Sequence, residues 1–162
     1  MSVTGGQRSD SGIVSARLAE LGIELPEVVT PLAAYVPAVR TGNLVYTSGQ
    51  LPMVAGALPQ AGKVGGGVTP EDAKGLARLC ALNALAAVHA LVGIDSVVRV
   101  VKVVGFVASA PGFNGQPGVI NGASELFGEV FGDAGAHARS AVGVSELPLD
   151  APVEVELIVE VA

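Results

Sequence analysis

Aromatic and basic residues are both scarce in this sequence of 162 residues. It has no tryptophan, two tyrosines and four phenylalanines, and its nine Lys and Arg stand against fifteen Asp and Glu, a formal net charge of −6. The basic residues are scattered along the chain without a cluster. Nucleic-acid binding rests on several cationic contacts to phosphate, and single strands also need aromatic surfaces for stacking. The composition therefore argues against a nucleic-acid partner.

Disulfides and membrane spans have no support in the sequence either. Cys80 is the only cysteine, so no disulfide can form within the chain. The first residues contain no apolar signal-peptide core. The most apolar window, residues 91–107, is interrupted by charged residues and glycine, short of the roughly 18 apolar residues of a membrane span. We expect a cytoplasmic protein with no membrane partner.

Aliphatic residues are what the chain has in abundance. Hydrophobic residues make up 50% of the sequence and charged residues only 15%. This length suits one domain, expected at residues 11–162 after a flexible N-terminus at residues 1–10. So much apolar surface predicts a symmetric oligomer, because a small monomer would expose part of it.

The C-terminal region carries the strongest pattern. Residues 153–161 alternate between apolar side chains and a mostly acidic face, which indicates a strand with one buried face. Residues 139–144 form a second strand candidate, and the prolines between the two predict a hairpin. Arg139 opens the first strand and Glu154 lies on the acidic face of the second. They share a face if the hairpin loop has even length, and point oppositely if it is odd.

The remaining pattern alternates strands and helices. Strands are expected at residues 34–40, 44–50 and 97–108, and helices at residues 11–22, 69–92 and 119–131. The order predicts an α+β fold, one sheet with two helices on one face and an extra N-terminal helix.

Few single residues suggest chemistry by themselves. Ser48 and Gly49 end a strand, where a hydroxyl and a free amide can donate to a ligand, although a simple bend explains them equally well. Cys80 lies in the apolar stripe of its helix and is interpreted as a buried small hydrophobe. His89 has no partner at metal-ligand spacing, so neither a metal nor a cofactor is expected. A lone Arg139 is most simply a solvated charge.

Several segments together nevertheless resemble the RidA (YjgF) family, also labelled endoribonuclease L-PSP. The order and spacing of the matching segments carry the resemblance, which covers nearly everything after the first helix. They are Tyr35, Gly42 and Asn43, residues 47–52, Asn121, residues 139–142, residues 147–148 and residues 153–156.

The resemblance implies a chorismate-mutase-like (Bacillus type) fold assembled as a homotrimer, with ligand clefts between subunits. It also implies hydrolysis of 2-imino or enamine acids to 2-keto acids and ammonia. Arg139 would hold the substrate carboxylate of this small metabolite, and Glu154 would position or activate water. By the same resemblance, the substrate-binding positions are Tyr35, Ser48, Gly49, Asn121, Arg139 and Ala141.

One matching position departs from the family pattern. Ala141 stands where the archetype carries a cysteine, so the pocket is altered. The leading expectation is an imine or enamine deaminase, and the alternative is a non-catalytic trimeric sensor of small carboxylates. An endoribonuclease is disfavoured by the acidic charge, and a chorismate mutase rests on fold analogy alone.

Overall fold

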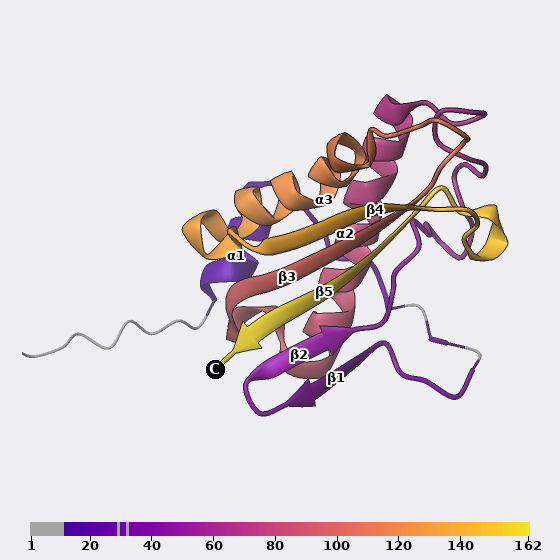
Figure 1. Cartoon of the computed structure of the whole chain (residues 1–162). Helices are drawn as coiled ribbons and strands as arrows, with labels where there is room; N and C mark the ends of the chain where they lie inside the picture. The colour runs from indigo at the N-terminus through magenta and orange to yellow at the C-terminus, as the bar shows by residue number, and fades with distance from the viewer. Residues whose placement is uncertain (1–11, 29, 32) are drawn as a thin grey trace, which may run out of the picture.

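The molecule is built on one five-stranded sheet whose strand order is β1-β2-β5-β3-β4. The computed structural model describes residues 12–28, 30–31 and 33–162. Two long helices, α2 and α3, cover one face of the sheet, and Figure 1 is viewed from the opposite side, here called the open face. The predicted α+β fold, with the chorismate-mutase-like arrangement, is confirmed. The expected flexible segment, residues 1–10, lies outside the described residues.

Most predicted elements are present, with shifted ends in a few cases. In chain order the helices and strands are α1 (Ile13–Glu20), β1 (Ala38–Thr41), β2 (Leu44–Thr47), α2 (Pro70–Val92), β3 (Val97–Ala108), α3 (Gln116–Phe131), β4 (Ala138–Val144) and β5 (Val153–Val161). Short 3-10 turns lie at η1 (Ile94–Ser96), η2 (Gly132–Gly135) and η3 (Pro148–Asp150). Helix α3 begins three residues before the prediction, because Pro117 occupies its first turn, where no backbone N–H is needed.

The predicted hairpin between the last two strands is wrong. Strand β3 lies between them, parallel to β4 and antiparallel to β5. Helix α3 carries the chain from the end of β3 back to its start, so β4 must run parallel to β3. Alternation along a strand indicates which of its faces is buried, but not which strand lies next to it. The sequence pattern therefore predicted two strands correctly and their pairing wrongly.

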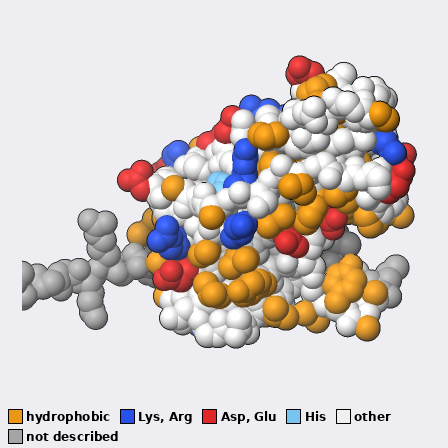
Figure 2. Space-filling model, viewed as in Figure 1, with side chains coloured by type: hydrophobic (Ala, Val, Ile, Leu, Met, Phe, Trp, Pro, Cys, Tyr) orange, Lys and Arg blue, Asp and Glu red, His pale blue; other side chains and the backbone are white. Residues whose placement is uncertain are grey.

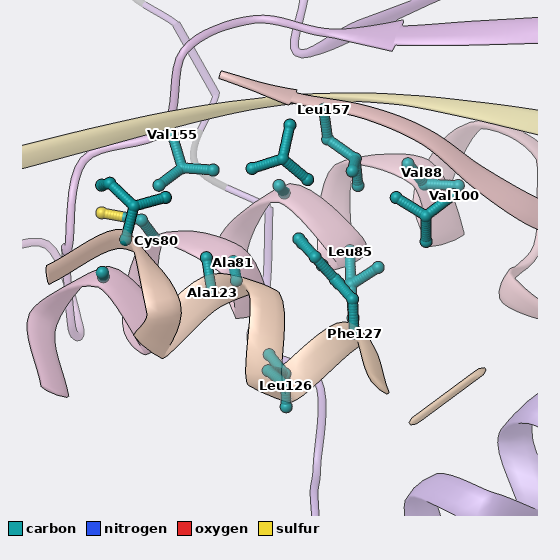
Figure 3. Close-up of a cluster of buried hydrophobic side chains, with 14 of the residues drawn as sticks. Cys80, Ala81, Leu85, Val88, Val100, Ala123, Leu126, Phe127, Val155 and Leu157 are labelled. Atoms are coloured by element: carbon teal, nitrogen blue, oxygen red, sulfur yellow. The ribbon is translucent and has the colours of Figure 1, made fainter. Parts of the chain in front are cut away.

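The core lies between the sheet and helices α2 and α3 (Figure 3). The five alternate apolar residues of β5, Val153, Val155, Leu157, Val159 and Val161, are all buried, as their alternation predicts. Cys80 is fully buried beneath β5, with its Sγ 3.8 Å from the carbonyl oxygen of Val153. Burial, and secondarily the charge of Glu154, raises the pKa of the Cys80 thiol well above its ordinary value. Cys80 is therefore a packing residue, as interpreted from the sequence.

Helix α2 has a well-defined start and a buried face. The Thr69 hydroxyl accepts a hydrogen bond from the Asp72 amide at 3.1 Å, and Pro70 follows the cap. By length and composition alone α2 could cross a membrane, but 56% of its most apolar window is buried inside the molecule. That burial is typical of the core helix of a globular protein.

Helices α2 and α3 approach each other closely at Gly122. A Cβ at this position would overlap the main-chain carbonyl of Lys74. Backbone cannot swing aside as a side-chain end can, so the helix pair requires glycine here. Two salt bridges join the same helices at the surface, Lys74 with Glu125 and Arg78 with Glu129, at 3.1 and 3.2 Å.

We expect Gly122→Ala to lower the free energy of unfolding by about 1–3 kcal/mol, because α3 must move away from α2. Gly128→Ala on the same helix is the matched control, since a Cβ there meets nothing within 4 Å. The control should raise stability by about 0.5–1 kcal/mol through helix propensity. Urea unfolding of both variants checks the pair, and equal effects would contradict the close approach.

Candidate functional site

Arg139 lies near the start of β4, the edge strand next to α3. In register it stands beside Val103 of β3, which pairs in turn with Leu157 of β5, and both of these side chains are buried against the helices. Arg139 therefore belongs to the helix-facing side of the sheet. Its Nη1 donates to Asn121 Oδ1 at 2.7 Å and to Ser124 Oγ at 3.3 Å.

The charge of Arg139 is not neutralised by a carboxylate of this chain. Four salt bridges are present in the described part of the molecule, and none includes this half-buried guanidinium. Both acceptors on α3 are neutral, and both bind the same nitrogen. The edge formed by Nε and Nη2 makes no hydrogen bond within the described residues, so a two-pronged contact with an external anion is available there.

Ala141 and Asn121 flank this guanidinium from the strand and the helix. Ala141 pairs in register with Gly105 and shares the face of Arg139, where it packs against the core. Asn121 lies in the second turn of α3 rather than the first, because the helix begins earlier than predicted. Both predicted binding positions thus lie on the Arg139 side of the sheet.

Glu154 points to the other side of the sheet. It pairs in register with Phe106, which pairs in turn with Val142, a side chain 45% exposed on the open face. The sequence left the relative facing of Arg139 and Glu154 open, and the register places them on opposite faces. Strand β3 lies between β4, which carries Arg139, and β5, which carries Glu154. The faces of the two residues are therefore set by their pairing with β3 and not by the length of the loop between β4 and β5.

Gly49 lies against Glu154, and Tyr35 shares a hollow with Gly49. A Cβ at Gly49 would overlap the Glu154 carboxylate, so this glycine allows the acid to lie against the backbone. Gln50 bridges β5 at Val155 through two main-chain hydrogen bonds, which fixes Gly49 at this place. Tyr35, which is 57% exposed, and Gly49 line one shallow hollow of about 160 Å³.

Ser48 has a structural role within the chain. Its hydroxyl donates to the carbonyl oxygen of Val36 at 2.6 Å, and its amide donates to that of Pro37 at 2.8 Å. Both groups tie the segment that carries Tyr35 to the end of β2. The donors expected to face a ligand from this serine are therefore occupied.

The sequence-predicted residues thus form two groups in one chain. Arg139, Asn121 and Ala141 make one, and Glu154 with Gly49 and Tyr35 makes the other, with Ser48 supporting it. Two residues near Arg139 had not been singled out, Ser124 and His137, whose Oγ and Nε2 lie 2.9 Å apart. Spacing offered a signal for Ser124, since it follows Asn121 by three residues on a helix and shares its face.

His89 and metal binding give no second candidate. His89 Nδ1 accepts a hydrogen bond from the Ile94 amide at 3.0 Å, which closes the C-terminal end of α2. Among the residues that the structure describes, no three or more His, Cys, Asp or Glu side chains are grouped so as to hold a metal ion.

Burial, followed by the neighbouring charge of Glu156, raises the pKa of Glu154 above its ordinary value. A raised native pKa means that the folded state binds the proton more tightly, so stability falls as pH rises through the window between the ordinary and the raised value. We therefore expect Glu154→Gln to have a higher melting temperature than the wild type at neutral pH. The difference should disappear at pH values below the ordinary pKa of a glutamate, where Glu154 is protonated in both the folded and the unfolded state.

Glu160→Gln provides the control for that experiment. Glu160 lies on the same strand and the same face but pairs in register with Arg99. Its replacement should leave the melting temperature unchanged or slightly lower at neutral pH. A gain from Glu154→Gln that persists undiminished in acid would contradict the electrostatic origin.

The chain is similar to known proteins over most of its length. The family described as endoribonuclease L-PSP matches residues 25–161. Protein TCP17 of Trypanosoma cruzi is 44% identical over 154 residues, covering 93% of this chain and 95% of its own.

Two solved structures are informative. Protein Atu1372 of Agrobacterium tumefaciens, described as of unknown function, is 46% identical, with a TM-score of 0.86 over 94% of this chain and 95% of its own. TdcF of E. coli, solved with bound serine, is 26% identical, with a TM-score of 0.63 over 84% of this chain and 94% of its own.

Proposed function

The chain belongs to the endoribonuclease L-PSP family, which includes the YjgF and Rid proteins, and we propose that it hydrolyses small 2-imino or enamine acids to 2-keto acids and ammonia. The observation that carries the proposal is the half-buried guanidinium of Arg139, held on one nitrogen by neutral acceptors with its other edge open. A carboxylate of amino-acid size fits such an edge. The serine bound to TdcF is a ligand of that class.

The reaction needs a held carboxylate, a polarised C=N bond and a water molecule. Water adds its oxygen to C2 of the imine while a proton goes to the nitrogen, and the resulting carbinolamine releases ammonia as the C2 carbonyl forms. Arg139 anchors the acid, and Glu154 accepts the proton of the attacking water. Partial burial raises the pKa of Glu154 and so favours proton uptake by its carboxylate, which suits a general base.

We propose a homotrimer in which each cleft combines the two groups of site residues. Within one chain Arg139 and Glu154 lie on opposite sides of the sheet, so one ligand meets both only if the second comes from a neighbouring subunit. Arg139, Asn121 and Ala141 of one subunit would then face Glu154, Gly49 and Tyr35 of the next.

The open face of the sheet supports this assembly. It carries Val39, Tyr46 and Val142, which are 52%, 39% and 45% exposed. Figure 2 shows hydrophobic side chains on this side of the molecule, mixed with carboxylates and cations. An apolar sheet face of this kind is normally covered by another layer, and three such faces packed inward would cover one another.

Two other functions are weaker. A non-catalytic sensor of small carboxylates would bind its ligand through the same residue, Arg139. The alanine at position 141 favours a sensor if the cysteine of the family archetype contributes to turnover. RNA cleavage, suggested by the family description, is opposed by the net charge of −6 and the scattered basic residues. We place the protein in the cytoplasm, as expected from its single cysteine.

Arg139→Ala should lower kcat/KM for freshly generated 2-aminoacrylate roughly 100-fold or more, because two charge-assisted hydrogen bonds to the substrate are lost. Arg17→Ala is the control, since that arginine bonds Glu20 on its own helix and the Glu129 carbonyl of α3. Keto-acid release measures both variants. Thermal stabilisation of the wild type by pyruvate without any turnover would instead establish the sensor.

The assembly is tested by mass in solution. We expect a particle of three times 16.1 kDa, and Tyr46→Glu should dissociate it by placing a charge in the interface. Leu91→Glu, at an exposed position of α2 on the helix layer, is the control and should remain trimeric. A wild-type monomer in sedimentation velocity would overturn the shared cleft.

A further inference from the structure

A chain of hydrogen bonds continues from Arg139 into the protein through Ser124 and His137. His137 Nδ1 lies 2.6 Å from the carbonyl oxygen of Gly135 in the η2 turn. A carbonyl oxygen only accepts, so Nδ1 carries the proton. In the neutral imidazole Nε2 is then an acceptor, and the Ser124 hydroxyl at 2.9 Å donates to it.

The direction of these bonds fixes what Ser124 offers to Arg139. With its only proton committed to His137, the Ser124 oxygen presents lone pairs to Arg139 Nη1 at 3.3 Å. Asn121 Oδ1 accepts from the same nitrogen at 2.7 Å. The two hydrogens of Nη1 are thereby both occupied, and the guanidinium plane is set by two residues on successive turns of α3.

The histidine ring is itself held from two sides. It packs perpendicular to the Phe127 ring, with a centroid separation of 5.9 Å and an interplanar angle of 89°. Phe127 is fully buried in the core. The turn that supplies the Gly135 carbonyl packs closely on α3, since a Cβ at Gly135 would overlap the Phe127 carbonyl.

We propose that the Ser124–His137 pair is a positioning element that holds the Arg139 guanidinium with its Nε and Nη2 edge presented to the substrate carboxylate. This inference rests on the proposed role of Arg139 in binding a carboxylate. It assigns Ser124 and His137 no contact with substrate. Their contribution is to the orientation of the anchor, so their loss weakens binding of carboxylate ligands in particular.

The test is a double-mutant cycle read by ligand binding and kinetics. Ser124→Ala and His137→Phe should each raise KM for the imino acid and Kd for pyruvate roughly 3- to 10-fold, as loss of one hydrogen bond predicts, with kcat little changed. Binding of pyruvamide, which lacks the carboxylate, should not change. The double variant should equal the single ones, because His137 acts only through Ser124.

Ser145→Ala is the control for loss of a serine hydroxyl elsewhere, because Ser145 is exposed beyond the end of β4. This variant should bind and turn over ligand as the wild type does. Ser124→Thr keeps the hydroxyl and should retain most of the affinity. Additive losses in the double variant, or equal losses for pyruvamide, would show two separate structural contributions and overturn the proposal.

A measurement on the wild type keeps the proposal testable if His137→Phe does not fold. Long-range ¹H–¹⁵N spectra of the imidazole should show the tautomer protonated at Nδ1, and a tautomer protonated at Nε2 would overturn the relay. Arg139→Ala separates this result from the proposed function. If Arg139→Ala binds pyruvate as the wild type does, the anchor itself is wrong, whereas loss there without loss in Ser124→Ala rejects only the positioning role.

Discussion

The pairing of β3 with two neighbours of opposite direction is the constraint on which the rest of the structure depends. β3 is antiparallel to β5 and parallel to β4. The parallel pair exists because α3 returns the chain across the covered face of the sheet, and this places α3 directly over the start of β4. The same geometry brings Asn121 and Ser124 to Arg139.

This topology also divides the site chemistry between the two sides of the sheet. A half-buried guanidinium lies on the helix side, and a partly buried carboxylate lies over Gly49 on the open face. Burial has different consequences for the two groups. Neutral acceptors keep the arginine in place without cancelling its charge, whereas desolvation and Glu156 favour the protonated form of Glu154. A candidate anion anchor and a candidate base are therefore both present, and the proposed cleft between subunits would join them.

Prediction from the sequence succeeded where the signal is local. The alternation of β5, the β-branched run of β3 and the capped start of α2 gave those elements their observed limits. It failed for the partner of β4, because strand pairing depends on residues far apart in the chain. Ser48 shows the same limit at the site, since its hydroxyl is occupied by the Val36 carbonyl. Ser124 and His137 were missed because their significance lies in a contact between a helix and a turn.

The sequence alone determined most of the elements, the buried face of β5, the position of Cys80 in the core and the family resemblance, because periodicity and composition act over a few neighbouring residues. Only the tertiary structure decided that Arg139 and Glu154 face opposite ways. It also decided that Arg139 is held by α3 through one nitrogen and that Gly49 lies against Glu154. Those relations follow from the register across three strands and from the helix crossing between two of them, which no local pattern encodes.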